Sequence, residues 1–378
     1  MKSAEWRSSC DDAITRTSDA KVLASLLFGR AYAAVEDYRY EDALKDLDAA
    51  LNALPDNAKY LRERAYVQAE LSNFEQAIAD LDHAVRLNPK DILNYRERAF
   101  ARHYSGDLQG AYDDRAREFE LTPDSADALM ARGIAAVWLG RFDDAKADLK
   151  RARSLAKSAN DDDVQSSADE WLSNLDHWRN TTRGGDAVKL CQMERLEDRK
   201  NAPKLIGDCS KVYLDAKAGD QKADALTTRS AAWLLATGSQ NNSTEDMRIA
   251  LALDPKNIQR HINLGYSYLS SNHSWAANRE FERAVAMERS PMALAGRAAA
   301  RKNLGDKDGA FADARDSIEL EPTEPAAWVL ADLEFDNGNL DGARQLYLLL
   351  YERGSRSDLL MERLRDLGVP DPAAAVKK

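Results

Sequence analysis

The chain has 378 residues, of which 44% are hydrophobic and 31% charged, and its formal net charge is −11. The apolar content suffices for a folded core and excludes global disorder, while the acidic balance argues against a dedicated nucleic-acid binder, which usually carries a basic face. Three cysteines cannot form a disulfide scaffold, and no apolar run reaches the ~18–20 residues of a membrane span.

The first 18 residues contain no apolar stretch of the kind that marks a signal peptide. The sequence as it stands therefore predicts a cytoplasmic protein, or a periplasmic one if a signal peptide has been removed. Cys10 lies in a short segment that we expect to form a helix ahead of the first repeated units.

A repeat with a step of thirty-four begins near residue 24. Alanines near the start of an amphipathic stretch and prolines at its end keep this step: Ala43, Ala77, Ala111 and Ala145, and Pro55, Pro89 and Pro123. Another helical stretch rich in small residues precedes each alanine. Apolar residues three and four apart predict helical hairpins with one buried face. A single hairpin cannot bury that face, so we expect the units to stack into a solenoid.

Residues 158–223 interrupt this repeat. An amphipathic stretch over residues 165–178 predicts a packing helix, and residues 204–216 predict another that contains Cys209. Gly184 and Gly185 make residues 181–186 the best hinge candidate, because glycine loosens the backbone.

The repeat returns over residues 224–368, where Ala277, Ala310 and Ala343 keep a step of thirty-three. The unit before them is degenerate around residues 237–244, and we expect Arg229 to pair with Asp246. A capping helix should end this part of the chain, followed by a flexible tail over residues 369–378.

These repeats resemble the tetratricopeptide repeat family, of the type common in bacterial proteins. The signature of the family is met in the second unit by Leu61, Ala65, Ala77, Ala84 and Pro89, whereas Gln68 and Leu81 replace preferred aromatic residues. The resemblance covers about 24–157 and 224–355. It implies an all-α, right-handed superhelical solenoid of about eight hairpins, with an N-terminal array (1–157), an irregular helical insert (158–223), a C-terminal array (224–368) and the tail (369–378).

A charged pair recurs inside the hairpins. Each arginine of one set is followed sixteen residues later by an aspartate: Arg30 and Asp46, Arg64 and Asp80, Arg98 and Asp114, Arg132 and Asp148, and Arg297 and Asp313. Where the first position is Leu264 the second is Glu280, and where it is Leu330 the second is Leu346. We interpret these as internal salt bridges, since planar bidentate geometry favours arginine over lysine. The alternative is a row of ligand-binding arginines.

Chemical motifs are scarce in this sequence. The five histidines include no two at metal-ligand spacing on one helix, and no phosphate-binding loop or nucleophile motif is present. We therefore expect no enzyme, no cofactor and no metal site. For Cys191 and Cys209 the simpler interpretation is two small buried residues on helix faces. The other is a disulfide or thiol switch, which would leave Cys10 unpaired.

The first helices of tetratricopeptide hairpins line a concave groove, and matching positions here give the candidate partner-binding residues. They are Phe28, Tyr32, Arg62, Tyr66, Arg96, Phe100, His103, Met130, Ile134, Trp138 and Tyr266. Four of these residues form a stripe at the step of the repeat: Tyr32, Tyr66, Phe100 and Ile134. This stripe either packs between hairpins or anchors a peptide. With Arg62 and Arg96, the stripe would hold a segment with apolar anchors and acidic residues. The Lys and Asn of the family's carboxylate clamp are absent.

We accordingly expect a non-catalytic scaffold that binds a peptide or protein segment in the groove, with no nucleic-acid partner. Two alternatives stay open. One is a self-assembling structural subunit of a bacterial envelope or secretion complex, and the chain would then form a homo-oligomer. The other is a thiol-regulated enzyme or sensor that uses residues 186–216.

Overall fold

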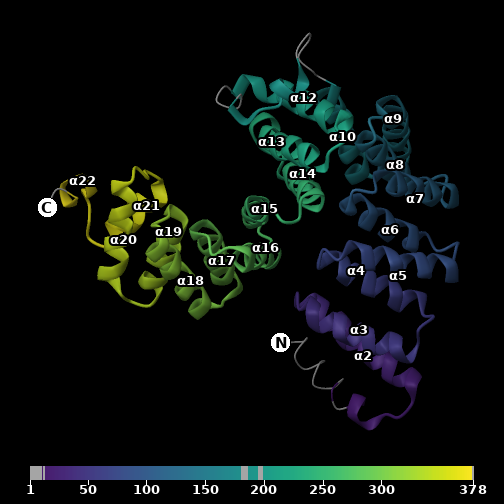
Figure 1. The fold of residues 1–378 in the computed structure, drawn as a ribbon, viewed down its shortest axis with the longest axis horizontal. Helices are drawn as coiled ribbons and strands as arrows, with labels where there is room; N and C mark the ends of the chain where they lie inside the picture. The colour runs from purple at the N-terminus through teal and green to yellow at the C-terminus, as the bar shows by residue number, and fades with distance from the viewer. Residues whose placement is uncertain (1–10, 12, 180–185, 195–198, 377–378) are drawn as a thin grey trace. The chain divides into compact units, whose positions relative to one another are not determined.

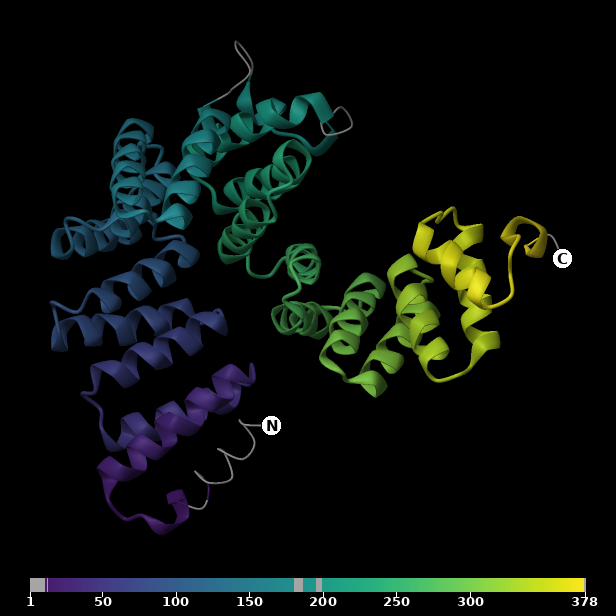
Figure 2. The same cartoon turned by 180° about the vertical axis from the view of Figure 1, so that it is seen from behind.

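The computed structural model describes residues 11, 13–179, 186–194 and 199–376, and every regular element among them is helical (Figures 1 and 2). The predicted all-α fold of repeated hairpins is confirmed. Cys10 and residues 180–185, which hold most of the predicted hinge, lie outside the described residues. The chain divides into two compact units, Met1–Ala236 and Thr237–Lys378.

The described part of the first unit opens with four helical hairpins, each helix packing against its neighbours in the chain. They are α2 (Ala20–Glu36) with α3 (Tyr40–Ala53), α4 (Ala58–Glu70) with α5 (Phe74–Leu87), α6 (Ile92–Ser105) with α7 (Leu108–Leu121), and α8 (Ala126–Trp138) with α9 (Phe142–Ala159). After them come α10 (Asp162–Arg179), α11 (Ala187–Leu190), the short 3-10 helix η2 (Arg199–Asn201), α12 (Ala202–Asp215) and α13 (Gly219–Thr237).

The second unit continues the hairpin pattern (Figure 1). Its helices are α14 (Gln240–Leu253), α15 (Ile258–Ser270), α16 (Ser274–Met287), α17 (Pro291–Leu304), α18 (Lys307–Leu320), α19 (Glu324–Asp336), α20 (Leu340–Glu352), α21 (Asp358–Asp366) and α22 (Pro372–Ala375). The pairs α15 with α16, α17 with α18 and α19 with α20 each pack as hairpins.

Helix-capping residues mark where each first helix begins. The side chains of Asn57, Asp91 and Ser125, one repeat apart, accept hydrogen bonds from backbone N–H groups in the first turns of α4, α6 and α8. Asn257, Ser290 and Thr323 do the same for α15, α17 and α19, at the shorter step of the second unit. These caps satisfy N–H groups that the helix itself cannot pair. They therefore fix the start of each hairpin in the chain.

The predicted arginine–aspartate pairs are present in all five hairpins that carry them. In each, arginine Nε and Nη2 donate to the two carboxylate oxygens at 2.5–2.9 Å, and the aspartates are buried. Arg64 and Arg98 also donate through Nη1 to Asp48 and Asp82, which lie sixteen residues before them on the preceding hairpin. These arginines thus tie the two helices of one hairpin together and link that hairpin to its neighbour.

In the second unit the core is built on close approach between helices. The buried ring of Phe281 on α16 fits between Gly265 on α15 and Gly296 on α17, where a Cβ atom would lie 2.7 Å and 2.2 Å from ring carbons. Glycine is required at both positions because any larger side chain would displace this ring.

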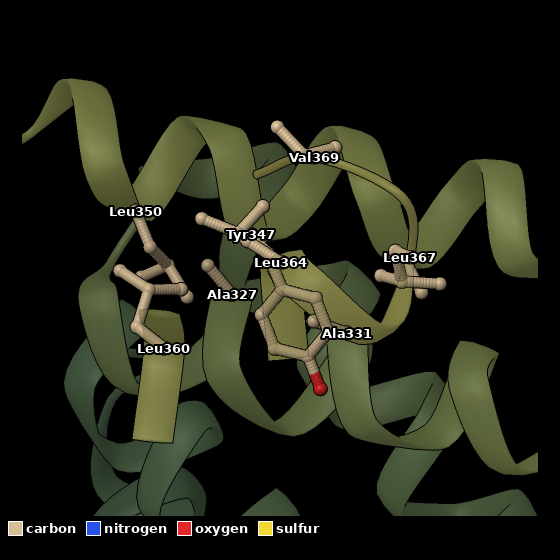
Figure 3. Close-up of a cluster of buried hydrophobic side chains, with 9 residues drawn as sticks. Ala327, Ala331, Tyr347, Leu350, Leu360, Leu364, Leu367 and Val369 are labelled. Atoms are coloured by element: carbon tan, nitrogen blue, oxygen red, sulfur yellow. The ribbon is translucent and has the colours of Figure 1, made fainter. Parts of the chain in front are cut away.

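A separate cluster of buried side chains ends the second unit (Figure 3). It includes Tyr347 and Leu350 of α20, Leu360 and Leu364 of α21, and Val369. Val369, where the sequence predicts a flexible tail, is buried in this cluster, and Pro372 at the start of α22 is buried as well. The cluster covers the apolar end of the last hairpin, as a capping segment of a repeat array must.

Candidate functional site

The candidate residues on the first helices of the first unit differ widely in exposure. Tyr32 on α2 is 51% exposed, and no ring contact or hydrogen bond involves its side chain within the described chain. A larger group is half-buried: Phe28, Arg62, Tyr66, Arg96, Phe100, His103, Met130 and Ile134. Trp138 is only 2% exposed. Trp138 is therefore a core residue, and its assignment as a partner-binding residue is wrong.

Aromatic contacts join neighbouring first helices. Phe28 of α2 stacks on Tyr60 of α4 with ring centroids 4.7 Å apart, and Lys59 Nζ lies 4.7 Å from the Phe28 ring centre. Further along the array, the ring centroids of His103 on α6 and Trp138 on α8 are 5.0 Å apart, and within α6 those of Phe100 and Tyr104 are 4.7 Å apart. Part of each aromatic side chain is thus used in packing, and the remaining surface is left to solvent.

The two candidate arginines have partners inside the chain. Arg62 of α4 donates through Nη1 to Asp91, the N-cap of α6, at 2.9 Å and to Asn94 at 3.0 Å. Arg96 of α6 contacts the buried carboxylate of Glu118 at 2.7 Å, which Arg115 also contacts at 2.8 Å. Arg62 fixes the start of α6 against α4, and Arg96 neutralises a buried acid. Both roles are structural, and the sequence spacing did not reveal either of them.

Two glutamates on the same helices have no such partners. Glu63 of α4 and Glu97 of α6 are half-buried, and neither carboxylate has a hydrogen bond or ion pair within the described chain. Burial raises the pKa of Glu63. The charges of Arg62 and Lys59 oppose this rise, and the charge of Glu97 adds to it. Burial likewise raises the pKa of Glu97, against the charges of Arg115, Arg62 and Arg96. The charged form of both carboxyl groups is therefore disfavoured at these positions. A search for motifs could not single them out among 64 acidic residues.

Tyr66 lies close to both glutamates. Burial and the charge of Glu70 raise the pKa of its phenol, and the charges of Glu63 and Glu97 add to that rise. The ring of Tyr66 lies 6.5 Å from that of Tyr40. An aromatic ring and two unpaired carboxylates therefore share one region of α4 and α6.

In the second unit, Tyr266 of α15 is half-buried. Its ring lies 5.0 Å from that of Phe281, its hydroxyl donates to the carbonyl oxygen of Met292, and burial raises its pKa to about 12. Tyr266 connects α15 to the start of α17 and so joins two hairpins within this unit.

Comparison with known families agrees with this geometry. Residues 28–92, which span the hairpins from α2 to the start of α6, match the model of the tetratricopeptide repeat family. The chain contains tetratricopeptide repeats. This match supports a general role in protein binding. No curated protein matches the sequence.

Solved structures similar to this tetratricopeptide chain include yeast Tom70, at 13% identity and a TM-score of 0.33, covering 94% of this chain and 97% of that one. A tetratricopeptide repeat protein from Parabacteroides merdae has 14% identity and a TM-score of 0.32, with 82% and 98% covered. The P58(IPK) TPR domain has 17% identity and a TM-score of 0.28, with 94% and 99% covered.

Beyond the fourth tetratricopeptide hairpin, an arginine is enclosed by aromatic rings. Arg229 of α13 is fully buried, and its guanidinium carbon lies 3.9 Å from the ring centre of Trp178 and 5.0 Å from that of Trp138. Tyr213 of α12 adds a third ring, and Ser210 accepts a hydrogen bond at 2.8 Å. This cluster explains why Trp138 is buried, because helices from the 158–223 region cover the end of the tetratricopeptide array.

The two cysteines after α10 form a disulfide. Cys191 and Cys209 are bonded, with Cα atoms 4.8 Å apart, so the interpretation as two unlinked buried residues is wrong. The bond attaches the segment after α11 to α12, next to Ser210, which holds Arg229. The bond therefore ties this segment to a packed region of the first unit.

Two kinds of feature are absent from the described residues. No cluster of three or more histidine, cysteine, aspartate or glutamate side chains there could hold a metal ion. None of the helices described has the length and apolarity to cross a membrane.

Proposed function

We propose that this protein is a non-catalytic scaffold that binds a peptide or protein segment across the first helices of its N-terminal tetratricopeptide hairpins. The observation that carries the proposal is a row of side chains spaced one repeat apart. The row begins with the half-exposed ring of Tyr32 and continues with the half-buried side chains of Tyr66, Phe100 and Ile134. Rigid aromatic side chains supply large contact areas at low entropic cost and are enriched among residues that dominate binding.

The rigidity of this surface supports the same role. The first helices are held by N-caps, by internal arginine–aspartate pairs and by the Arg62 link from α4 to Asp91. A preformed surface loses little conformational entropy when a partner binds, so more of the contact free energy appears as affinity. Met130, Phe28 and His103 extend the proposed surface along the array. Tyr266 belongs to the second unit and would bind only a partner that also reaches that unit.

The test is affinity capture from an extract of the cells that make the protein, read by mass spectrometry. The wild-type chain is compared with Tyr32→Ala/Tyr66→Ala and with a control, Leu87→Ala, which truncates an exposed side chain at the end of α5. We expect to find a protein that the wild type and the control capture in equal amounts. The amount that the double variant captures should be at least tenfold lower. Equal capture by all three chains would contradict the proposed surface.

A further inference from the structure

The fourth hairpin of the first unit carries a row of basic side chains along its second helix, α9. The members of this basic row are Lys146, Lys150, Arg153 and Lys157. Because they are spaced by four, three and four residues, they lie on one face of the helix, and the row is about 16 Å long at 1.5 Å per residue. All four residues are exposed to solvent.

Most of the charge in the basic row has no counterion in the described chain. Arg153 donates through Nη1 to Asp169 of α10 at 2.9 Å, and both side chains are about half exposed. The ammonium groups of Lys146, Lys150 and Lys157 make no hydrogen bond or ion pair with any described residue. This face of α9 is therefore positively charged, on a chain whose net charge is −11.

One position of the basic row is acidic in earlier hairpins. Asp48 on α3 and Asp82 on α5 each accept a hydrogen bond from the arginine sixteen residues later, on the next hairpin. Lys150 occupies the same position on α9, and the residue sixteen positions after it is Ser166 of α10. The charge that joins one hairpin to the next is thus inverted on α9. Packing within the array gives this lysine no partner, so its charge is left for a group outside the chain.

The surroundings of the basic row favour a narrow anionic partner. Exposed acids lie just before and just after the row in the chain, at Asp143 in the first turn of α9 and at Asp162 and Asp163 in the first turn of α10. A membrane surface or a nucleic-acid duplex presents negative charge over a wide area and would meet these acids as well, which is unfavourable. A single acidic protein segment avoids them, since about five residues of extended chain span the row.

We propose that the basic row of α9 is a second binding surface, which holds an acidic segment of a partner protein. Carboxylates along that segment accept charge-assisted hydrogen bonds from Lys146, Lys150 and Lys157. The basic row lies on a second helix, whereas the surface proposed above lies on first helices, so this inference does not depend on the earlier one.

The experiment uses two fluorescent dodecapeptides, one of alternating glutamate and serine and one of alternating glutamine and serine. Their affinities for the full chain are measured by fluorescence anisotropy. The test variant is Lys146→Gln/Lys150→Gln/Lys157→Gln. The matched control is Lys90→Gln/Lys256→Gln/Lys307→Gln, which removes the same charge from three exposed lysines that are far apart in the sequence. The control separates the effect of the basic row from that of total charge.

We expect wild type and control to bind the glutamate peptide at least tenfold more tightly than the glutamine peptide, and the test variant to lose most of that preference. The preference should fall as salt is added, because exposed charges are screened. Circular dichroism checks that the test variant is folded, as expected for changes at exposed positions. No glutamate preference in wild type, or an equal preference in test variant and control, would overturn the proposal.

Two further comparisons distinguish the class of partner and the surface. Vesicles rich in phosphatidylserine and a DNA duplex are tested in the same way, and tighter binding of either one through the three lysines would show that the partner is not an acidic protein segment. The variant Tyr32→Ala/Tyr66→Ala should bind the glutamate peptide as wild type does. A loss of glutamate-peptide binding in that variant would contradict a separate surface on α9.

Discussion

In the first unit, the arginine sixteen residues earlier holds each of Asp46, Asp80, Asp114 and Asp148, whereas three successive hairpins of the second unit do not all use this pair. Of those three, only α17 with α18 has the same pair, Arg297 and Asp313. In α15 with α16, Glu280 is bound by His261 Nδ1 at 2.7 Å and by Arg283 at 2.9 Å. In α19 with α20, the Tyr347 hydroxyl donates to Asp332 at 2.6 Å.

This difference teaches that a hairpin with a buried acid at this position, such as Asp313 or Glu280, needs donors for that acid rather than an arginine at one position. His261 is one helical turn before Leu264 and reaches the same acid from there. Its other nitrogen, Nε2, faces the carbonyl oxygen of Pro255 at 3.1 Å.

The largest expected effect comes from breaking the pair in the second unit. His261→Leu should destabilise the chain by about 3 kcal/mol, because it removes the shorter of the two hydrogen bonds that His261 and Arg283 make to the buried carboxylate of Glu280. Adding Leu264→Arg should restore part of that loss by supplying the arginine found in the other hairpins. Urea denaturation followed by circular dichroism measures both. A double variant no more stable than the single one would show that an arginine at position 264 cannot replace His261 as the donor to Glu280.

A smaller effect is expected in the first unit. Arg64→Ala should cost about 2 kcal/mol, less than a fully buried pair, because the guanidinium is partly exposed while Asp80 is buried. Arg64→Leu with Asp80→Leu should recover much of this loss, since apolar residues of similar size can replace such a pair. If denaturant titrations gave the same free energy of unfolding for Arg64→Ala and for the double variant, loss of the pair would not be the cause of the destabilisation.

The two units should also respond differently to pH. Burial alone would raise the pKa of Glu280, but the hydrogen bond from His261 and the charge of Arg283 outweigh burial and lower it. Its stabilising contribution is therefore present above the ordinary glutamate pKa and is lost as pH falls through the lowered value. The raised pKa values of Glu63 and Glu97 act in the opposite direction: stability is present at low pH and lost as pH rises through them.

Glu97→Gln tests this difference directly. It should raise the melting temperature at pH 7 by roughly 2–4 °C, and the gain should shrink as the pH falls towards 4, where the wild-type carboxyl becomes protonated. Glu280→Gln should instead lower the melting temperature at pH 7. Scanning calorimetry between pH 4 and pH 7 measures both, and a pH-independent gain for Glu97→Gln would contradict the assigned cause.

The smallest effect separates the two aspartates that Arg64 binds. Asp48→Asn should cost less than ~1 kcal/mol, because Asp48 is about half exposed and its contact with Arg64 is a surface ion pair. Asp80→Asn, at the buried end of the same guanidinium, should cost clearly more. Equal losses in denaturant titrations would mean that the link between hairpins matters as much as the pair within one.

Much of the fold follows from the sequence because its determinants repeat. The regular step of the repeat, the small residues at helix contacts and the sixteen-residue spacing of Arg64 and Asp80 are visible without coordinates and are confirmed. The caps at Asn57, Asp91 and Ser125 repeat equally regularly, so the same reasoning could have located them.

The binding surface was less predictable because exposure depends on neighbours that do not repeat. Trp138 occupies a surface position in the repeat pattern, but α10 and α12 place Trp178 and Tyr213 against it. The partners of Arg96 and Arg62 lie 22 and 29–32 residues away, at spacings that mark no motif. The disulfide joins a residue outside the helices to Cys209, and two cysteines 18 residues apart do not specify such a contact.

The double contacts of Arg64 and Arg98 have a consequence for how this array can change in length. Each of these arginines takes one acid from the hairpin before it and one from its own, sixteen residues away in either direction. Removal of residues 58–91 would place Arg98 sixteen residues after Asp48, in the position that Arg64 now occupies. Every buried carboxylate would then keep a cation. Whole units can therefore be deleted, duplicated or exchanged in this region without exposing an uncompensated charge at the junction, as recombination between repeats requires.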